Sequence, residues 1–148
     1  MYVAAPEGQA RPAVDSAGAL RQALLDARAI GYSTGPSGQA LLALLGDGGL
    51  RDALAARLRR APAGVPVATM VAGGDVDLGF QQLSELQGHP GVTLLGPMPP
   101  GLEIVTRFTA AVATNSGEPA TAQRVVDDFA SAHHDALRRR LGLATPAA

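Results

Sequence analysis

The chain contains no cysteine and no lysine, and all 12 of its basic residues are arginine. Without cysteine it has no disulfide framework, no thiol nucleophile and no zinc knuckle. Without lysine it lacks the amine of Schiff-base chemistry and the lysine of a nucleotide-binding P-loop. These absences exclude several common kinds of active site.

The chain also has little net charge and no long apolar run. The formal net charge is -1, so no broad basic field is present to attract nucleic acid. No apolar run is long enough to cross a bilayer, and the segment after Met1 lacks the basic start and apolar core of a signal peptide. We expect a soluble chain with no nucleic-acid partner, no membrane insertion and no signal peptide of its own.

Apolar residues make up 47% of the chain, which also has 18 glycines and 11 prolines. This composition suits a globular fold with many turns, and 148 residues are enough to bury a substantial core. Segments rich in alanine and leucine alternate with short valine and isoleucine runs, a pattern typical of α/β proteins. We therefore predict a single α/β domain over residues 1–148.

Apolar periodicity, caps and turn residues predict the individual elements. Residues 1–14 are expected to be extended, and Asp15 or Ser16 caps the first helix. Arg57, Arg59 and Arg60 are expected in the last turn of a helix, where they complement its dipole. Predicted strands cover 29–33, 76–80, 92–95 and 102–114, and predicted helices begin near residues 16, 38, 50, 66, 81 and 119, the last continuing to 141.

Residues 29–39 predict a short buried strand that runs through a Gly/Pro turn straight into a helix. The first N–H groups of such a helix and the positive end of its dipole form a site for an anion. The hydroxyls of Ser33, Thr34 and Ser37 would point at the same spot, and Gly35 and Gly38 let a ligand approach the backbone. The alternative is local: Ser37 caps the helix and the glycines tighten the turn.

Two later junctions have the same form. The turn at 62–66 opens a short helix, and the strand at 76–80 leads directly into a helix at Gln81. Each junction presents a helix N-terminus, and we expect all three to serve one site.

Three segments in chain order carry a resemblance to a known family: ARAIGYS at 27–33, GPSG at 35–38 and GDVDLGFQQLSEL at 74–86. Over residues 10–143 the chain resembles the molybdate-type periplasmic solute-binding proteins of ABC importers. The resemblance implies a type II periplasmic-binding fold, in which two α/β lobes close on a ligand held by helix N-termini. The chain would be the second lobe, a three-layer αβα sandwich with a mixed, mainly parallel sheet. Its core would span 15–101, a returning strand and C-terminal helix would span 102–148, and the first half-lobe would be missing.

The resemblance also implies where the ligand binds. The family's second-lobe contacts fall on Ser37 and Gly38, on the backbone around Gly64 and Val65, and on Gln82, where molybdate binders typically have tyrosine. An amide both donates and accepts, which leaves open molybdate or tungstate, another oxyanion, or a small organic acid. The full set of predicted ligand-binding residues is Ser33, Thr34, Ser37, Gly38, Gly64, Val65, Gln81 and Gln82.

By the same resemblance, the chain is a non-enzymatic solute-binding component that serves an ABC permease. The implied location is the periplasm or another extracytoplasmic compartment. Ligand-sensing domains of transcription regulators share the type II fold and provide an alternative role. The chain has no helix-turn-helix of its own, which argues against DNA binding but not against sensing.

A serine hydrolase is a further alternative, because Gly35–Gln39 nearly matches the nucleophile elbow Gly-x-Ser-x-Gly around Ser37. The glutamine breaks the motif, and Pro36 restricts the strained turn that exposes a nucleophile. His133 or His134 could complete a triad. Adjacent helical residues point about 100° apart, however, so these histidines cannot both ligate one ion, and we predict neither a metal site nor a cofactor.

The C-terminal segments are expected to expose an apolar face that has no native partner. Large exposed apolar surfaces are seldom left open in soluble proteins. We therefore predict self-association as a homodimer or a swapped pair, the alternative being a monomer whose last helix folds back over its own sheet. The apolar residues concerned are Ile104, Phe108, Val125, Phe129 and Leu137.

Overall fold

The computed structural model describes residues 1–144, so the end of the predicted domain at 145–148 lies outside the described residues. The chain divides into two compact units, Met1–Thr106 and Arg107–Ala148. None of the described helices is long and apolar enough to span a membrane.

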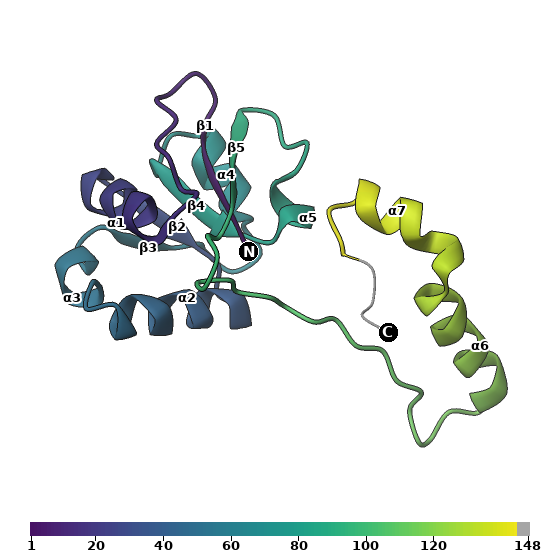
Figure 1. The fold of residues 1–148 in the computed structure, drawn as a ribbon. Coiled ribbons are helices and arrows are strands. Elements are labelled where there is room, and N and C mark those ends of the chain that lie inside the picture. The colour runs from purple at the N-terminus through teal and green to yellow at the C-terminus, as the bar shows by residue number, and fades with distance from the viewer. Residues whose placement is uncertain (145–148) are drawn as a thin grey trace. The chain divides into compact units, whose positions relative to one another are not determined.

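Five strands form the sheet of the first unit: β1 (Tyr2–Pro6), β2 (Ile30–Tyr32), β3 (Leu58–Arg60), β4 (Leu78–Gln81) and β5 (Val92–Pro97). Their order is β3-β2-β4-β1-β5 (Figure 1). β2 is parallel to β3 and β4, whereas β1 is antiparallel to β4 and β5. Among the described strands β1 alone runs against the others, which confirms the mixed, mainly parallel sheet.

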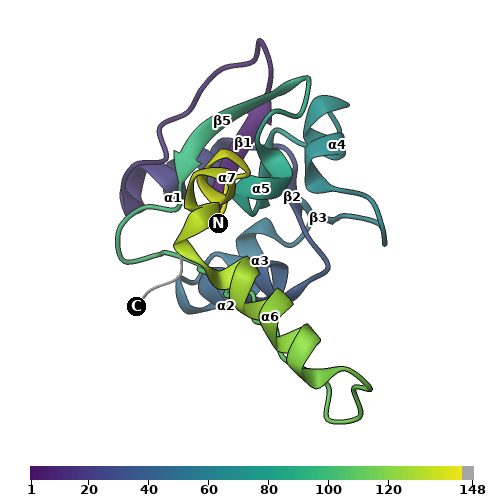
Figure 2. The same ribbon diagram turned by 90° about the vertical axis from the view of Figure 1, so that its right-hand side faces the viewer.

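The helices of the first unit are α1 (Ala17–Asp26), α2 (Pro36–Asp47), α3 (Arg51–Leu54), α4 (Val67–Ala72) and α5 (Leu83–Leu86). α1 and α2 pack on one face of the sheet, and α4 and α5 pack on the other (Figures 1 and 2). The three-layer αβα arrangement is therefore confirmed. The first helix also begins as predicted, because the Oγ of Ser16 accepts a hydrogen bond from the N–H of Ala19.

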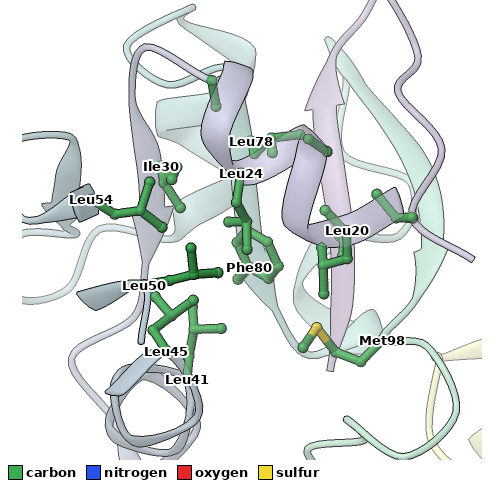
Figure 3. Close-up of a cluster of buried hydrophobic side chains, with 14 residues drawn as sticks. Leu20, Leu24, Ile30, Leu41, Leu45, Leu50, Leu54, Leu78, Phe80 and Met98 are labelled. Carbon is green, nitrogen blue, oxygen red and sulfur yellow. The ribbon is translucent and has the colours of Figure 1, made fainter. Parts of the chain in front are cut away.

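Alternation along the strands decides which helices each side chain meets. In β1, Val3 packs beneath α1 and α2, whereas the next residue, Ala4, packs with Ala68 of α4. Phe80 of β4 is fully buried among leucines from α1 and α2 (Figure 3). Burying a side chain of this size contributes about 1.5–3 kcal/mol, so this cluster supplies much of the unit's stability.

Two strand glycines let α4 lie close against the other face of the sheet. A Cβ on Gly79 would lie 2.3 Å from Cγ2 of Val71 and 2.9 Å from Cγ1 of Val67. A Cβ on Gly31 would lie 3.2 Å from Cγ1 of Val67. Because glycine has no side chain at these two positions, α4 can pack closely against β2 and β4.

The predicted helical turn at Arg57, Arg59 and Arg60 is wrong. α3 is short, and Arg59 and Arg60 belong to the edge strand β3. The guanidinium of Arg57 donates to the carbonyl oxygens of Leu25 at 2.5 Å and Ala27 at 3.2 Å. The last carbonyls of a helix lack intrahelical partners, so Arg57 closes the end of α1 instead of its own helix.

The predicted strand at 102–114 is not formed, because that segment has no regular secondary structure and no strand among the described residues pairs with it. Half-buried and exposed side chains nevertheless alternate at the start of this segment. Leu102 and Ile104 pack against the core of the first unit, while Val105 is 84% exposed. Ile104 is therefore half-buried against the core of the first unit, contrary to the prediction that it has no partner. At the other end of the chain, the residues expected only to be extended form β1 inside the sheet.

The predicted continuous C-terminal helix is broken into α6 (Pro119–Ala130), a 3₁₀ turn (Ala132–His134) and α7 (Asp135–Arg140). Ser131 has extended backbone angles, φ -65° and ψ 150°, which end α6. The guanidinium of Arg138 donates to the carbonyl oxygens of Phe129 and Ser131 and to the carboxylate of Asp135. One arginine thus holds the start of α7 against the end of α6.

Candidate functional site at the ends of two parallel strands

The carboxyl ends of β2 and β4 lie side by side, because Tyr32 of β2 pairs with Phe80 of β4. Both strands lead into a helix within a few residues, β2 into α2 and β4 into α5. In open α/β sheets, ligands bind outside the carboxyl ends of the strands. The structure therefore brings two of the predicted strand–helix junctions to one edge of the sheet.

Ser37 lies in the first turn of α2 and is 3% exposed. The N-cap of α2 is Gly35, and Pro36 follows it at the first helical position, so Ser37 does not cap the helix. The Oγ of Ser37 lies 3.1 Å from the Oγ of Ser33 and donates to Oε1 of Gln82 at 3.4 Å. Its hydroxyl is thus directed across the strand ends, not at its own backbone.

Gln82 extends this connection to a fourth segment of the chain. Its Nε2 donates to the Oγ1 of Thr106 at 3.1 Å. Ser33, Ser37, Gln82 and Thr106 therefore form one continuous hydrogen-bonded set, which we call the polar row. None of the four side chains titrates near neutral pH, so the positive potential here comes from the N-terminus of α2.

Thr106 is a candidate that sequence reasoning missed. Thr106 is half-buried at the end of the first unit. It is the third half-buried residue, after Leu102 and Ile104, in a segment where half-buried and exposed residues alternate. The amino group of Met1 donates to the carbonyl oxygen of Ile104 at 2.5 Å and helps to hold this segment on the sheet. The alternation is visible in the sequence, but nothing in it shows that Thr106 meets Gln82.

Gly38 allows the turn before α2 to be this tight. A Cβ at this position would lie 1.9 Å from the carbonyl oxygen of Ser33 and 2.8 Å from its carbonyl carbon. No side chain can occupy that space, so the close approach of Ser33 to the first turn of α2 requires glycine.

Three other predicted site residues lie outside the polar row. Thr34 is exposed in the turn before α2. Gly64 and Val65 are exposed in the turn before α4, where Gly64 has a φ of +76°. The N–H of Val65 donates to the carbonyl oxygen of Pro62 at 3.0 Å, so this donor is already used within its own turn.

Gln81 is 6% exposed, and its Oε1 accepts the N–H of Val67 at 2.9 Å. Val67 is the first residue of α4, and the N-cap of that helix, Pro66, makes no side-chain cap hydrogen bond. An N-terminal N–H of a helix needs an acceptor from outside the helix. Gln81 supplies it from β4 and ties α4 to the sheet.

A serine hydrolase would need a base beside its nucleophile. The recorded side-chain partners of Ser37 are another serine and a glutamine, neither of which is a base. His133 and His134 belong to the second unit, where Nε2 of His134 lies 3.0 Å from Oδ2 of Asp128. No group of three histidine, cysteine or acidic residues within the described residues could hold a metal ion.

A charged pair lies at the opposite end of the same two strands. Arg28 precedes β2 and Asp77 precedes β4, and Nη2 of Arg28 lies 2.6 Å from Oδ1 of Asp77. The backbone N–H of Arg28 donates to Oδ2 at 2.6 Å, and its Nε donates to the same oxygen at 3.1 Å. Hydrogen bonding from the guanidinium holds the pKa of Asp77 below its usual value. The pair fastens β2 to β4 where the two strands begin.

Comparisons with known proteins agree with the geometry. A family model described as bacterial extracellular solute-binding protein matches residues 1–143. Aconitate isomerase from Pseudomonas sp. is 33% identical over 130 residues, which cover 87% of this chain and 49% of that protein. The chain therefore spans about half the length of this relative.

Two solved structures share the fold. One, described as the substrate-binding domain of a molybdenum ABC transporter from Clostridium difficile, has a TM-score of 0.68 at 16% identity, over 99% of this chain and 63% of that one. The other, the periplasmic molybdate-binding protein of Azotobacter vinelandii, has a TM-score of 0.60 at 19% identity, over 99% and 65% of the two chains. These likenesses confirm the predicted periplasmic-binding fold.

Proposed function

Since this chain belongs to the bacterial extracellular solute-binding protein family, we propose that it binds a small anion at the polar row and the N-terminus of α2. It acts as a non-enzymatic binding component or as a lobe of one. The observation that carries the proposal is the hydrogen-bonded connection of Ser33, Ser37 and Gln82 beside the first turn of a 12-residue helix. Hydroxyl, amide and backbone N–H groups around a helix N-terminus are suited to hold an oxyanion.

The ligand class that fits these groups is a small oxyanion such as molybdate or tungstate, or a small organic acid. The two solved structures described above are named for molybdenum or molybdate. In the importer role, the protein delivers the ligand to an ABC permease from the periplasm or another extracytoplasmic compartment. A ligand-sensing domain would use the same site, and its ligand would alter the contacts of a partner protein instead of being delivered.

A second candidate function, isomerisation of a carboxylate ligand, follows from the similarity to aconitate isomerase. Isomerisation by proton transfer needs a base or an acid near the substrate. The polar row contains serine, glutamine and threonine side chains and none with a pKa near neutrality. This favours binding over catalysis in the residues described here.

Isothermal titration calorimetry of the chain with molybdate, tungstate, sulfate, phosphate and small carboxylates tests the proposal. One lobe would supply only part of a two-lobed site, so we expect a dissociation constant of about 1 mM. This corresponds to a binding free energy of about -4 kcal/mol. Ser37→Ala should weaken binding about threefold to tenfold, as expected for the loss of one hydrogen bond. The matched control is Ser84→Ala, because Ser84 is exposed on α5.

Equal losses in the two serine variants would contradict the assignment of the site to the polar row. Absence of heat with every anion at millimolar concentration would overturn the proposed function. Conversion of aconitate by the chain, measured by NMR, would replace the binding role with the enzymatic one.

A further inference from the structure

We propose that two copies of this chain pair through their C-terminal helices, with α6 of each copy packed antiparallel on α7 of the other. The interface lies wholly within the second unit, whereas the polar row lies within the first. The inference therefore goes beyond the proposed function and does not depend on it. The surface concerned, which we call the C-terminal apolar face, consists of Val125 and Phe129 on α6 and of Leu137 and Leu141 on and directly after α7.

The C-terminal apolar face is open to solvent. Its least exposed member, Leu137, is 41% exposed, and its most exposed member, Phe129, is 69% exposed. None of the residues of α6 or α7 is buried. Since soluble proteins seldom leave large apolar surfaces uncovered, the face is suited to a protein partner.

The four side chains form one apolar stripe on each helix. Val125 and Phe129 are four positions apart within α6. The N–H of Leu141 donates to the carbonyl oxygen of Leu137 at 3.0 Å, which is the hydrogen bond of a helical turn. Residues four positions apart lie on the same side of a helix, so each pair makes a narrow stripe that another helix can cover.

The charges beside the two stripes indicate which stripe covers which. The stripes have the same form in the sequence, VVDDF at 125–129 and LRRRL at 137–141. In each, an exposed charged residue lies one position before the second apolar residue: Asp128 on α6 and Arg140 on α7. Because the spacing is identical, both charges lie on the same edge of their stripes, with opposite sign.

Antiparallel packing of α6 on α7 of the second copy brings these two edges together. When two helices face each other and run in opposite directions, corresponding edges lie on the same side of the contact. Asp128 of one copy then faces Arg140 of the other, and two-fold symmetry repeats the pair. Packing α6 on α6, or α7 on α7, would instead set like charges against each other. Charge complementarity therefore selects the mixed arrangement and a second copy as the partner.

The contact that Asp128 makes within its own chain leaves it able to form this pair. Nε2 of His134 lies 3.0 Å from Oδ2 of Asp128, and 67% of the Asp128 side chain is exposed. A carboxylate accepts at both of its oxygens. Oδ1 can therefore receive a guanidinium N–H from the second copy while Oδ2 remains with His134.

Disulfide cross-linking between separately prepared chains tests the arrangement. The chain has no cysteine, so an introduced cysteine has no competitor. We expect an equimolar mixture of Asp128→Cys and Arg140→Cys chains to form a linked dimer about tenfold faster than the control mixture. The control is Asp127→Cys with Arg139→Cys, because each of these residues lies two positions from both members of its stripe and so faces away from it.

Charge reversal tests the pairing of Asp128 with Arg140, with the dimer dissociation constant measured by analytical ultracentrifugation. Asp128→Arg and Arg140→Asp each bring like charges together twice in the dimer and should weaken it about tenfold. The chain with both substitutions has opposite charges again and should recover the wild-type constant to within about threefold. The contact with His134 is lost in that chain too, so it cannot cause the recovery. Asp127→Arg is the control and should leave the constant unchanged.

Circular dichroism and thermal melts establish that each variant is folded. A wild-type chain that stays monomeric up to millimolar concentration would overturn the inference. Equal rates of cross-linking in the two cysteine mixtures would overturn the packing of α6 on α7. A folded double variant that dimerises no better than the single variants would overturn the charge pairing that identifies the partner.

Discussion

Gly38 faces the carbonyl oxygen of Ser33 so closely that a Cβ on the glycine would lie 1.9 Å from that oxygen. Because the obstacle is backbone, it cannot move aside as a flexible side chain would. We expect Gly38→Ala to lower the free energy of unfolding by about 1–3 kcal/mol, as overpacking does, and to weaken anion binding. Urea denaturation monitored by circular dichroism measures the first effect.

Gly18→Ala is the matched control for this prediction. Gly18 lies in the first turn of α1, and a Cβ there would meet nothing within 4 Å. The substitution should be neutral or raise stability by up to about 1 kcal/mol, because alanine favours helix. Similar losses in the two alanine variants would show that the contact with Ser33 is not the cause.

Gln81→Leu should destabilise the first unit by about 1–3 kcal/mol, because the buried N–H of Val67 would lose its acceptor. Chemical denaturation measures this loss. Hydrogen exchange should also become faster at the start of α4, which the amide of Gln81 holds. Gln9→Leu, at an exposed loop position, is the control and should change stability little. Unchanged exchange in α4 would contradict this role of Gln81.

Asp77→Asn should reduce stability at neutral pH by weakening the contact with Arg28. The pKa of Asp77 is lowered in the folded chain, so its contribution is fully present above the ordinary carboxyl pKa of about 4 and is lost as pH falls through the lowered value. The difference between wild type and variant should therefore shrink toward zero in strong acid. Denaturation at a series of pH values measures it.

The control for this pair is Asp47→Asn, because Asp47 is an exposed carboxylate at the end of α2. Its replacement is not expected to lower stability at neutral pH. A deficit in Asp77→Asn that stays constant from neutral to strongly acidic pH would contradict an ionic origin.

Self-association remains a prediction. In α6, Val125 is 50% exposed and Phe129 is 69% exposed, so the helix carries an apolar face along one side. We expect light scattering at micromolar concentration to give a mass above that of a monomer, and Phe129→Asp to lower it. A monomeric mass for wild type, with unchanged solubility and thermal stability in the variant, would refute the prediction.

Several features follow from chemistry that acts within a few residues. The helix start at Ser16 and the strand–turn–helix at 29–39 were predictable because caps, glycines and prolines act on the backbone next to them. The likeness of 27–38 and 74–86 to one family also indicated the periplasmic-binding fold. Local patterns were ambiguous where elements are short. The sequence around residues 58–60 predicted the end of a helix, but these residues form β3 because they pair with the parallel strand β2.

Tertiary structure alone decided which side chains meet. Gln81 and Val67 are 14 positions apart, Gln82 and Thr106 are 24 apart, and Arg28 and Asp77 are 49 apart. The sequence by itself placed Gln81 and Gln82 at the end of a strand. In the structure β4 extends through Gln81, and the alternation of side chains along the strand puts the two glutamines on opposite sides of the sheet. Which of the two meets the N-terminus of α4 and which meets Ser37 depends on the order of the strands and on the helices packed against each face.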